Sequence, residues 1–161
     1  MENSLLTGKC TLVPSHFFDR STARDMLAGV VSLEDSDKVS DIEIAQYGAV
    51  LIYGSSDGEE SLPELYYVLQ DLPSCREYNK ILCSWRSGIL TMAIAQGRQL
   101  LLANVYPAKD FTTAEYYIFL AMKSLQLNPE VSTVCWRSAL DQDEEMSLYR
   151  YFKSVEVAPC E

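Results

Sequence analysis

The stretch GILTMAIAQGRQLLLANVYPAKDFTTAEYYIFLAMKSLQLNP, from Gly88 to Pro129, decides the fold. Within it, two apolar runs, residues 89–95 and 100–105, flank the polar connection Gln96-Gly97-Arg98-Gln99. A glycine in a short polar connection between two β-type runs is typical of a hairpin. The stretch therefore predicts two antiparallel strands.

A helix is predicted shortly after this hairpin. Thr112 and Glu115 have the spacing of a capping box, in which each side chain satisfies a backbone N–H group of the first turn. Asn128-Pro129 is expected to stop the helix, because proline has no N–H group and pushes the preceding residue out of the helical region. Apolar residues along 112–127 form a stripe wider than one sheet face requires. We expect this helix to be covered on two sides.

The other segments from Lys80 onward are also periodic. They predict a strand before the hairpin and, after the helix, a strand, a helix and a last strand, at residues 81–85, 131–136, 139–152 and 155–157. In the second helix, Met146, Tyr149 and Phe152 are expected to face inward. Helices that follow strands imply parallel, right-handed crossovers. The order β-β-β-α-β-α-β is that of the ribonuclease H-like lobe used by nucleases and, in pairs, by actin-like ATPases.

The first half of the chain predicts a smaller α/β lobe. A helix capped by Asp19 or Ser21 is expected between short strands, and Ser61-Leu62-Pro63-Glu64 combines an N-cap, an early proline and a capping-box glutamate. The expected strands are residues 10–13, 42–44 and 49–53, an exposed acidic connection covers 32–41, and the second helix runs to about Gln70. The break at 71–74 divides the chain into a reduced N-terminal lobe, 1–73, and a C-terminal lobe, 74–161.

The charge of the chain excludes two classes of partner. Its 161 residues carry 23 acidic and 13 basic side chains, a formal charge of -10. Such a chain repels nucleic acid and anionic membrane surfaces. The acidic side chains concentrate at 34–37, 57–60 and 141–145, where we expect solvated loops and helix starts.

Cysteine usage indicates the compartment. The five cysteines are an odd number without a CxxC pair, so we expect reduced and mostly buried thiols at Cys10, Cys75, Cys83, Cys135 and Cys160. The sequence opens with no charged-then-apolar leader and has no run of about 18 apolar residues. The expected location is the cytoplasm.

Three strings carry a resemblance to a known family. CTLVPSHFF (10–18), the stretch from Gly88 to Pro129 and YFKSVEVAP (151–159) resemble the bacterial domain-of-unknown-function family 3822. The resemblance implies an actin-like ATPase fold built from ribonuclease H-like lobes. The middle string is also similar to the hairpin and helix of pilus-assembly and cell-division actin homologues. Since the opening hairpins of a first lobe are not found before Cys10, we expect a shortened form.

The resemblance also directs attention to one turn. Actin-like ATPases hold Mg²⁺ and phosphates through an acidic residue and glycines between the first two strands of each lobe, because the metal prefers carboxylate oxygens and phosphates prefer backbone N–H groups. Here that turn reads Ser84-Trp85-Arg86-Ser87-Gly88, without a carboxylate. Arg86, Ser87 and Gly88 are candidates for holding a phosphate. The preferred interpretation is a plain β-turn with a solvent-facing arginine.

Other catalytic chemistries find little support in the sequence. Two-metal hydrolysis in a ribonuclease H-like fold needs carboxylates on the first and fourth strands, and neither 81–85 nor 131–136 contains one. Asp141 and Asp143 are expected to cap the following helix. His16 is the only histidine, so a His-rich metal site is excluded. A Cys–His nucleophilic pair lacks an identifiable orienting group, and we expect the His16 ring to pack on Phe17 or Phe18.

Two functions of different classes remain. The preferred hypothesis is a non-catalytic actin-like module that binds a protein partner or itself, without a cofactor. The alternative is a nucleotide-binding ATPase that uses ATP and Mg²⁺. No catalytic residue or metal ligand is assigned. Aromatic side chains beyond the needs of one lobe make Tyr116, Phe119 and Tyr149 the candidates for an interface.

Overall fold

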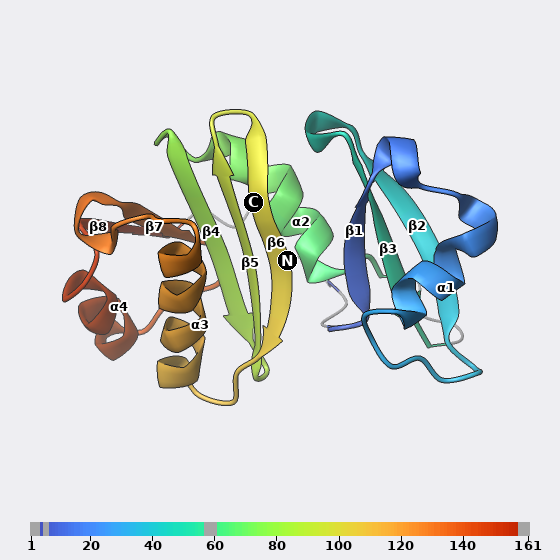
Figure 1. Ribbon diagram of the computed structural model, residues 1–161. Helices are drawn as coiled ribbons and strands as arrows, with labels where there is room; N and C mark the ends of the chain where they lie inside the picture. Colours follow the sequence, from blue (N-terminus) through green and yellow to red (C-terminus); the bar gives the residue numbers. More distant parts are fainter. Residues whose placement is uncertain (1–3, 5–6, 57–60, 158–161) are drawn as a thin grey trace.

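The structure is a computed structural model that describes residue 4 and residues 7–56 and 61–157. It contains two β-sheets that lie side by side, with a helix between them (Figure 1). The acidic run at 57–60, Cys160 and the last two residues of the YFKSVEVAP string lie outside the described residues.

The first sheet has three antiparallel strands in the order β1-β3-β2. Its elements are β1 (Cys10–Pro14), α1 (Ala23–Ala28), β2 (Lys38–Ile44) and β3 (Ala49–Ser55). The middle strand β3 is buried on both faces, as its continuous apolar sequence predicts. Val50 and Ile52 pack with Leu27 of α1, whereas Leu51 packs on the opposite face.

Strand β2 is longer than its sequence predicts. Residues 38–41, expected in an exposed connection, pair with β3 from Lys38↔Ser55 onward. Polar residues are tolerated there because one face of an antiparallel sheet can meet solvent. Single 3₁₀ turns connect the elements of this half: η1 (Ser15–Phe17), η2 (Arg20–Thr22) and η3 (Ala45–Tyr47). Asp19 caps η2 by accepting from the Ser21 N–H group at 3.0 Å.

The second sheet has the ribonuclease H-like order β6-β5-β4-β7-β8. Its strands are β4 (Asn79–Arg86), β5 (Ile89–Gln96), β6 (Gln99–Pro107), β7 (Thr133–Trp136) and β8 (Ser154–Val157). Strands β4, β5 and β6 form an antiparallel meander, and β7 and β8 are parallel to β4. The predicted hairpin is confirmed, with one irregularity in register between Ile94 and Ala95.

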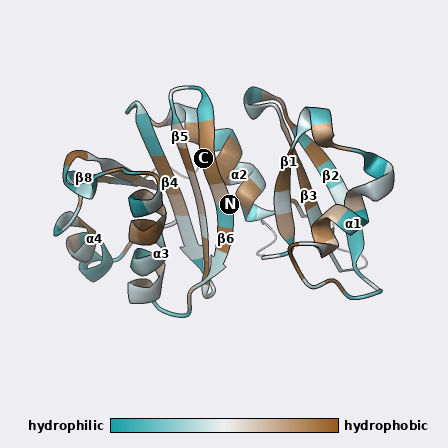
Figure 2. Cartoon of the chain, in the orientation of Figure 1, coloured by the Kyte–Doolittle hydropathy of each residue, from teal (hydrophilic) through white to brown (hydrophobic). Residues whose placement is uncertain are grey.

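Helices cover both faces of this second sheet (Figure 1). Two of them, α3 (Phe111–Ser124) and α4 (Gln142–Tyr149), pack on one face together with Ile81 and Cys83 of β4. The remaining helix, α2 (Glu64–Asp71), packs on the other face with Leu82. Figure 2 shows the corresponding hydrophobic residues in the middle of β4 to β6 and on α2. None of the helices in the described part of the chain is long and apolar enough to span a membrane.

Helix α2 packs against both sheets. Its buried side chains Leu65, Val68 and Leu69 belong to one cluster with Leu51 of the first sheet and Leu82 of the second. The 3₁₀ turn η4 (Leu72–Ser74) continues this packing. The division into lobes at residues 73 and 74 stays a prediction, because the helix before that boundary shares its core with the sheet after it.

The boundaries of α3 differ from the predicted 112–127. Asp110 provides the cap, accepting from the Thr113 N–H group at 2.7 Å, so the capping box of Thr112 and Glu115 is wrong. At the other end Gln126 adopts a left-handed conformation with φ 60°, and the Leu127 N–H group donates to the Met122 carbonyl at 2.8 Å. This is the Schellman arrangement, which ends the helix before proline is reached.

Helix α4 is shorter than the predicted 139–152, because a capping box of Asp141 and Glu144 starts it later. Asp141 therefore caps this helix as predicted. Met146 and Tyr149, expected to face inward, are 55% and 49% exposed, whereas Phe152 is buried as expected. The strand predicted over 131–136 starts only at Thr133, because Pro129–Val131 form the 3₁₀ turn η5.

Candidate functional site

The end of β4 carries Arg86, for which the sequence leaves open phosphate binding or exposure to solvent. Its guanidinium group turns toward Glu64, the first residue of α2, whose side chain is only 2% exposed. Arg86 Nη2 donates to Glu64 Oε1 at 2.6 Å and to Ser4 Oγ at 2.7 Å. Arg86 is therefore ion-paired to a buried carboxylate, which corrects the preferred interpretation of a plain solvent-facing arginine.

A second arginine reaches the same carboxylate from the end of β7. Arg137 Nη1 lies 3.2 and 3.0 Å from the two carboxylate oxygens of Glu64. Its Nε donates to Asp71 Oδ2 at 2.9 Å, and its guanidinium carbon lies 5.1 Å from the centre of the Tyr67 ring. We refer to Glu64, Asp71, Arg86 and Arg137 as the Glu64 cluster.

The sheet topology explains why the two arginines of this cluster meet. Strands β4 and β7 are parallel neighbours, so their C-terminal ends lie at the same edge of the sheet. Both carboxylates come from α2, one from its first residue and one from its last. Two carboxylates and two guanidinium groups balance each other in charge. The Glu64 cluster therefore joins α2 to the sheet through ion pairs centred on one buried carboxylate, whereas Asp71 and Arg86 remain partly exposed.

The turn after Arg86 has the backbone geometry of a tight hairpin. Ser87 and Gly88 have φ angles of 51° and 75°, as in the two-residue turns that match the twist of antiparallel strands. The Gly88 carbonyl accepts from the Ala108 N–H group at 2.8 Å. The three predicted phosphate candidates thus lie together at a strand end. Their only cation already has a carboxylate partner, which an incoming anion would have to displace.

Two buried polar atoms near this turn lack a hydrogen-bond partner among the described residues: Ser84 Oγ and Arg86 Nε. Successive side chains along β4 point to opposite faces of the sheet, so Ser84 and Arg86 lie on the same face, the one that carries the Glu64 cluster. Buried polar atoms without a partner are uncommon in folded proteins. They are the feature of this turn that favours a polar ligand.

His16 and the thiols of Cys10 and Cys83 do not form a nucleophilic site, and the described residues form no metal site. The ring of His16 lies 4.2 Å from that of Phe17, as predicted. Burial raises the pKa of Cys10 to about 12 and that of the fully buried Cys83 further, so both thiols stay protonated. Across residues 4, 7–56 and 61–157, no three His, Cys, Asp or Glu side chains are placed to hold a metal ion.

The predicted interface residues lie on the outer surface of α3 and α4. Tyr116 is 59% exposed, whereas Phe119 is half-buried against Tyr151 and Phe152, with ring centroids 5.0 and 5.7 Å away. Tyr149 contacts β8, where its hydroxyl group donates a hydrogen bond to the Val155 carbonyl at 3.2 Å. Tyr116 and Phe119 thus share one face of α3, and Tyr149 lies apart from them beside β8.

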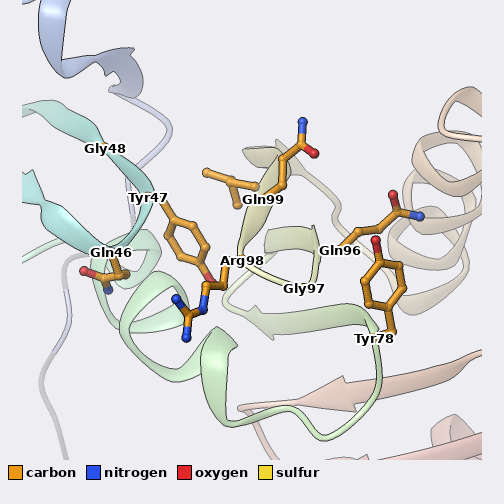
Figure 3. A pocket seen from close by; sticks show the side chains of 9 residues that line it. Gln46, Tyr47, Gly48, Tyr78, Gln96, Gly97, Arg98 and Gln99 are labelled. Carbon is orange, nitrogen blue, oxygen red and sulfur yellow. The ribbon is translucent and has the colours of Figure 1, made fainter.

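A groove of about 700 Å³ lies where the β5–β6 hairpin meets the first sheet. Figure 3 shows Arg98 and Tyr47 side by side on one side of the hairpin, and Tyr78 and Gln96 on the other. Part of its polar lining is used internally, since Gln96 Nε2 donates to Asn79 Oδ1 at 2.9 Å. The groove is open and its charged lining residue, Arg98, is exposed.

Comparisons with known proteins agree with this fold. Residues 5–155 match the family described as "Protein of unknown function (DUF3822)". No curated protein matches the chain. A solved structure from Bacteroides thetaiotaomicron VPI-5482, described as a protein with an actin-like ATPase fold and unknown function, superposes with a TM-score of 0.78 at 17% identity. The superposition covers 95% of this chain and 66% of that one, so the chain spans about two thirds of its length. The expected actin-like fold is confirmed.

Proposed function

Since the chain belongs to the family described as protein of unknown function DUF3822, we propose that it is a non-catalytic protein-interaction module built on the actin-like fold. The observation that carries this proposal is the Glu64 cluster. Arg86 is the one cation of the turn at which actin-like ATPases hold phosphate, and Glu64 binds it at 2.6 Å.

The electrostatics of the turn support the non-catalytic function. Arg86 is already ion-paired to the Glu64 carboxylate, which is only 2% exposed, so a phosphate group at this position would have to compete with that carboxylate for the guanidinium group. The turn itself also contributes no carboxylate to hold Mg²⁺, since the sequence from Ser84 to Gly88 contains no Asp or Glu. Nucleotide binding would therefore require Arg86 to leave Glu64.

The surface supports a protein partner rather than nucleic acid or a membrane. The formal charge of -10 disfavours polyanions. Exposed Tyr116 and Tyr149 are of the residue type that is enriched at protein interfaces. The proposal includes a cytoplasmic location, which the free thiols of Cys75, Cys83 and Cys135 support, because such thiols persist in a reducing compartment.

Thermal unfolding with and without millimolar Mg-ATP tests this proposal. A ligand at ~100 times its Kd stabilises the native state by about 2.7 kcal/mol, which corresponds to a rise in Tm of roughly 5 to 11 °C for a chain of this size. We expect no saturable rise. Mg²⁺ alone and ATP alone serve as controls for the effects of ionic strength.

The second candidate, a nucleotide-binding ATPase, is favoured by the unpartnered Ser84 Oγ and Arg86 Nε. A saturable rise in Tm with Mg-ATP that is lost in Arg86→Ala would establish nucleotide binding at this turn. The preferred function would then be abandoned.

A further inference from the structure

A second groove, of about 550 Å³, lies where the C-terminal ends of α3 and α4 meet η5. We refer to it as the α3–α4 groove. Its lining comprises Phe119, Lys123, Gln126, Leu127, Asn128, Pro129, Glu130, Arg150 and Tyr151. It lies outside both the Glu64 cluster and the groove of Figure 3.

Aromatic rings form the apolar part of the α3–α4 groove. Phe119 packs edge-on against Tyr151 and stacks on the buried Phe152, and Leu127 adds an aliphatic side chain. Tyr151 is nevertheless 48% exposed. Rings that are held in place by neighbours and open to solvent can accept an apolar side chain at a low entropic cost.

The charge of this groove is opposite to that of the whole chain. Lys123 and Arg150 line it together with a single acidic residue, Glu130, whereas the chain has a formal charge of -10. In the described parts of the chain, neither cationic side chain makes a hydrogen bond or an ion pair. Arg150 acts electrostatically on Glu115, which is buried between α3 and α4 and bonded to Ser147.

The position of these cations at helix ends has an ordinary explanation, because Lys and Arg near a helix C-terminus interact favourably with the helix dipole. That explanation does not account for the exposed rings between them. Two free cations around an aromatic floor form a surface complementary to a carboxylate-rich segment with one apolar side chain.

We propose that the α3–α4 groove binds an acidic peptide segment of a partner protein, with an apolar side chain of the peptide on Phe119 and Tyr151 and its carboxylates beside Lys123 and Arg150. This inference rests on the proposed function, because it names the partner chemistry of an interaction module. A polyphosphate is a poor occupant, since it carries no apolar group to place on Phe119 and Tyr151.

The test is a titration, followed by fluorescence anisotropy, of a fluorescein-labelled peptide with four glutamates around one phenylalanine. Saturable binding to the full chain is expected, weakened several-fold between about 50 and 300 mM salt. Lys123→Gln and Arg150→Gln should each lower the affinity by about threefold to fivefold, and the double variant by about tenfold or more. Lys38→Gln, at an exposed position in the first sheet, removes the same charge and should leave the affinity unchanged.

Three outcomes would overturn the inference. One is the absence of binding, and another is equal binding by the double variant or by a peptide with serine in place of phenylalanine. The third is self-association of the chain alone, seen by sedimentation and lost in the double variant, which would assign the groove to a second copy. The titration contains no nucleotide, so it can fail while the Mg-ATP experiment still supports an interaction module, and the reverse holds as well.

Discussion

At the scale of single residues, Glu64 shows where sequence reasoning ends. Its position after Ser61-Leu62-Pro63 predicts a capping-box glutamate, yet the carboxylate binds Arg86 and Arg137 instead. Those partners lie 22 and 73 residues further along the chain. Nothing local in the sequence signals such pairs. By contrast, the contact between His16 and Phe17 joins neighbours in the sequence and could be predicted.

Removing the charge of Glu64 should be costly for stability. Glu64→Gln removes the carboxylate charge to which both Arg86 and Arg137 are paired, and breaking a buried ion pair costs about 3–5 kcal/mol of unfolding free energy. Because the Arg86 side chain is 35% exposed, we expect about 2–3 kcal/mol in urea denaturation. The matched control is Asp41→Asn, which breaks the surface pair with Arg20, 81% exposed, and should cost less than about 1 kcal/mol. Equal losses in the two variants would mean that the Glu64 cluster contributes no more than a surface pair.

At the scale of elements, the sequence predicts which helices and strands exist better than where they start and end. Continuous apolar runs identify the hairpin of β5 and β6, and β5 is indeed buried on both faces. Helix starts depend on single hydrogen bonds instead. Asp110 and Thr112 are both plausible caps by residue type, and only the path of the backbone selects Asp110. Met146 and Tyr149 are predicted to face inward, and this prediction is wrong. Helix α4 is shorter than predicted, and its buried side chain is Leu148.

The two possible caps of α3 can be distinguished by mutation. Asp110→Ala removes the carboxylate that binds the Thr113 N–H group, and it should lower the unfolding free energy by about 1 kcal/mol. Thr112→Ala should change it by less than about 0.5 kcal/mol, because that side chain is exposed. Chemical denaturation monitored by circular dichroism measures both. The reverse order of effects would restore the capping box predicted from the sequence.

At the scale of the whole molecule, the order of apolar segments is sufficient to predict the ribonuclease H-like topology of the second sheet. The division into lobes is harder to predict, because a proline-containing break such as 71–74 looks the same between domains and within one. The shared cluster of Leu51, Leu65 and Leu82 depends on contacts that only the folded chain creates. The site is harder still, since the Glu64 cluster combines α2 with the ends of β4 and β7.

The shared core predicts that the two sheets unfold together. Amide hydrogen exchange at Leu51 in β3 and Ile94 in β5 should report unfolding free energies equal within about 1 kcal/mol, since side chains of both strands belong to the core cluster around α2. A markedly lower value at Leu51 would show that the first sheet opens by itself. The boundary predicted at residues 73 and 74 would then separate independently stable lobes.

The packing of α2 also has a consequence for folding during translation. A polypeptide leaves the ribosome with its N-terminus first and commonly folds in that order. Here the three strands of the first sheet can pair early, but the apolar side of α2 that faces Leu82 and Cys135 has to wait for β4 and β7 to be translated. Over that interval Leu65, Val68 and Leu69 are a ready substrate for a chaperone.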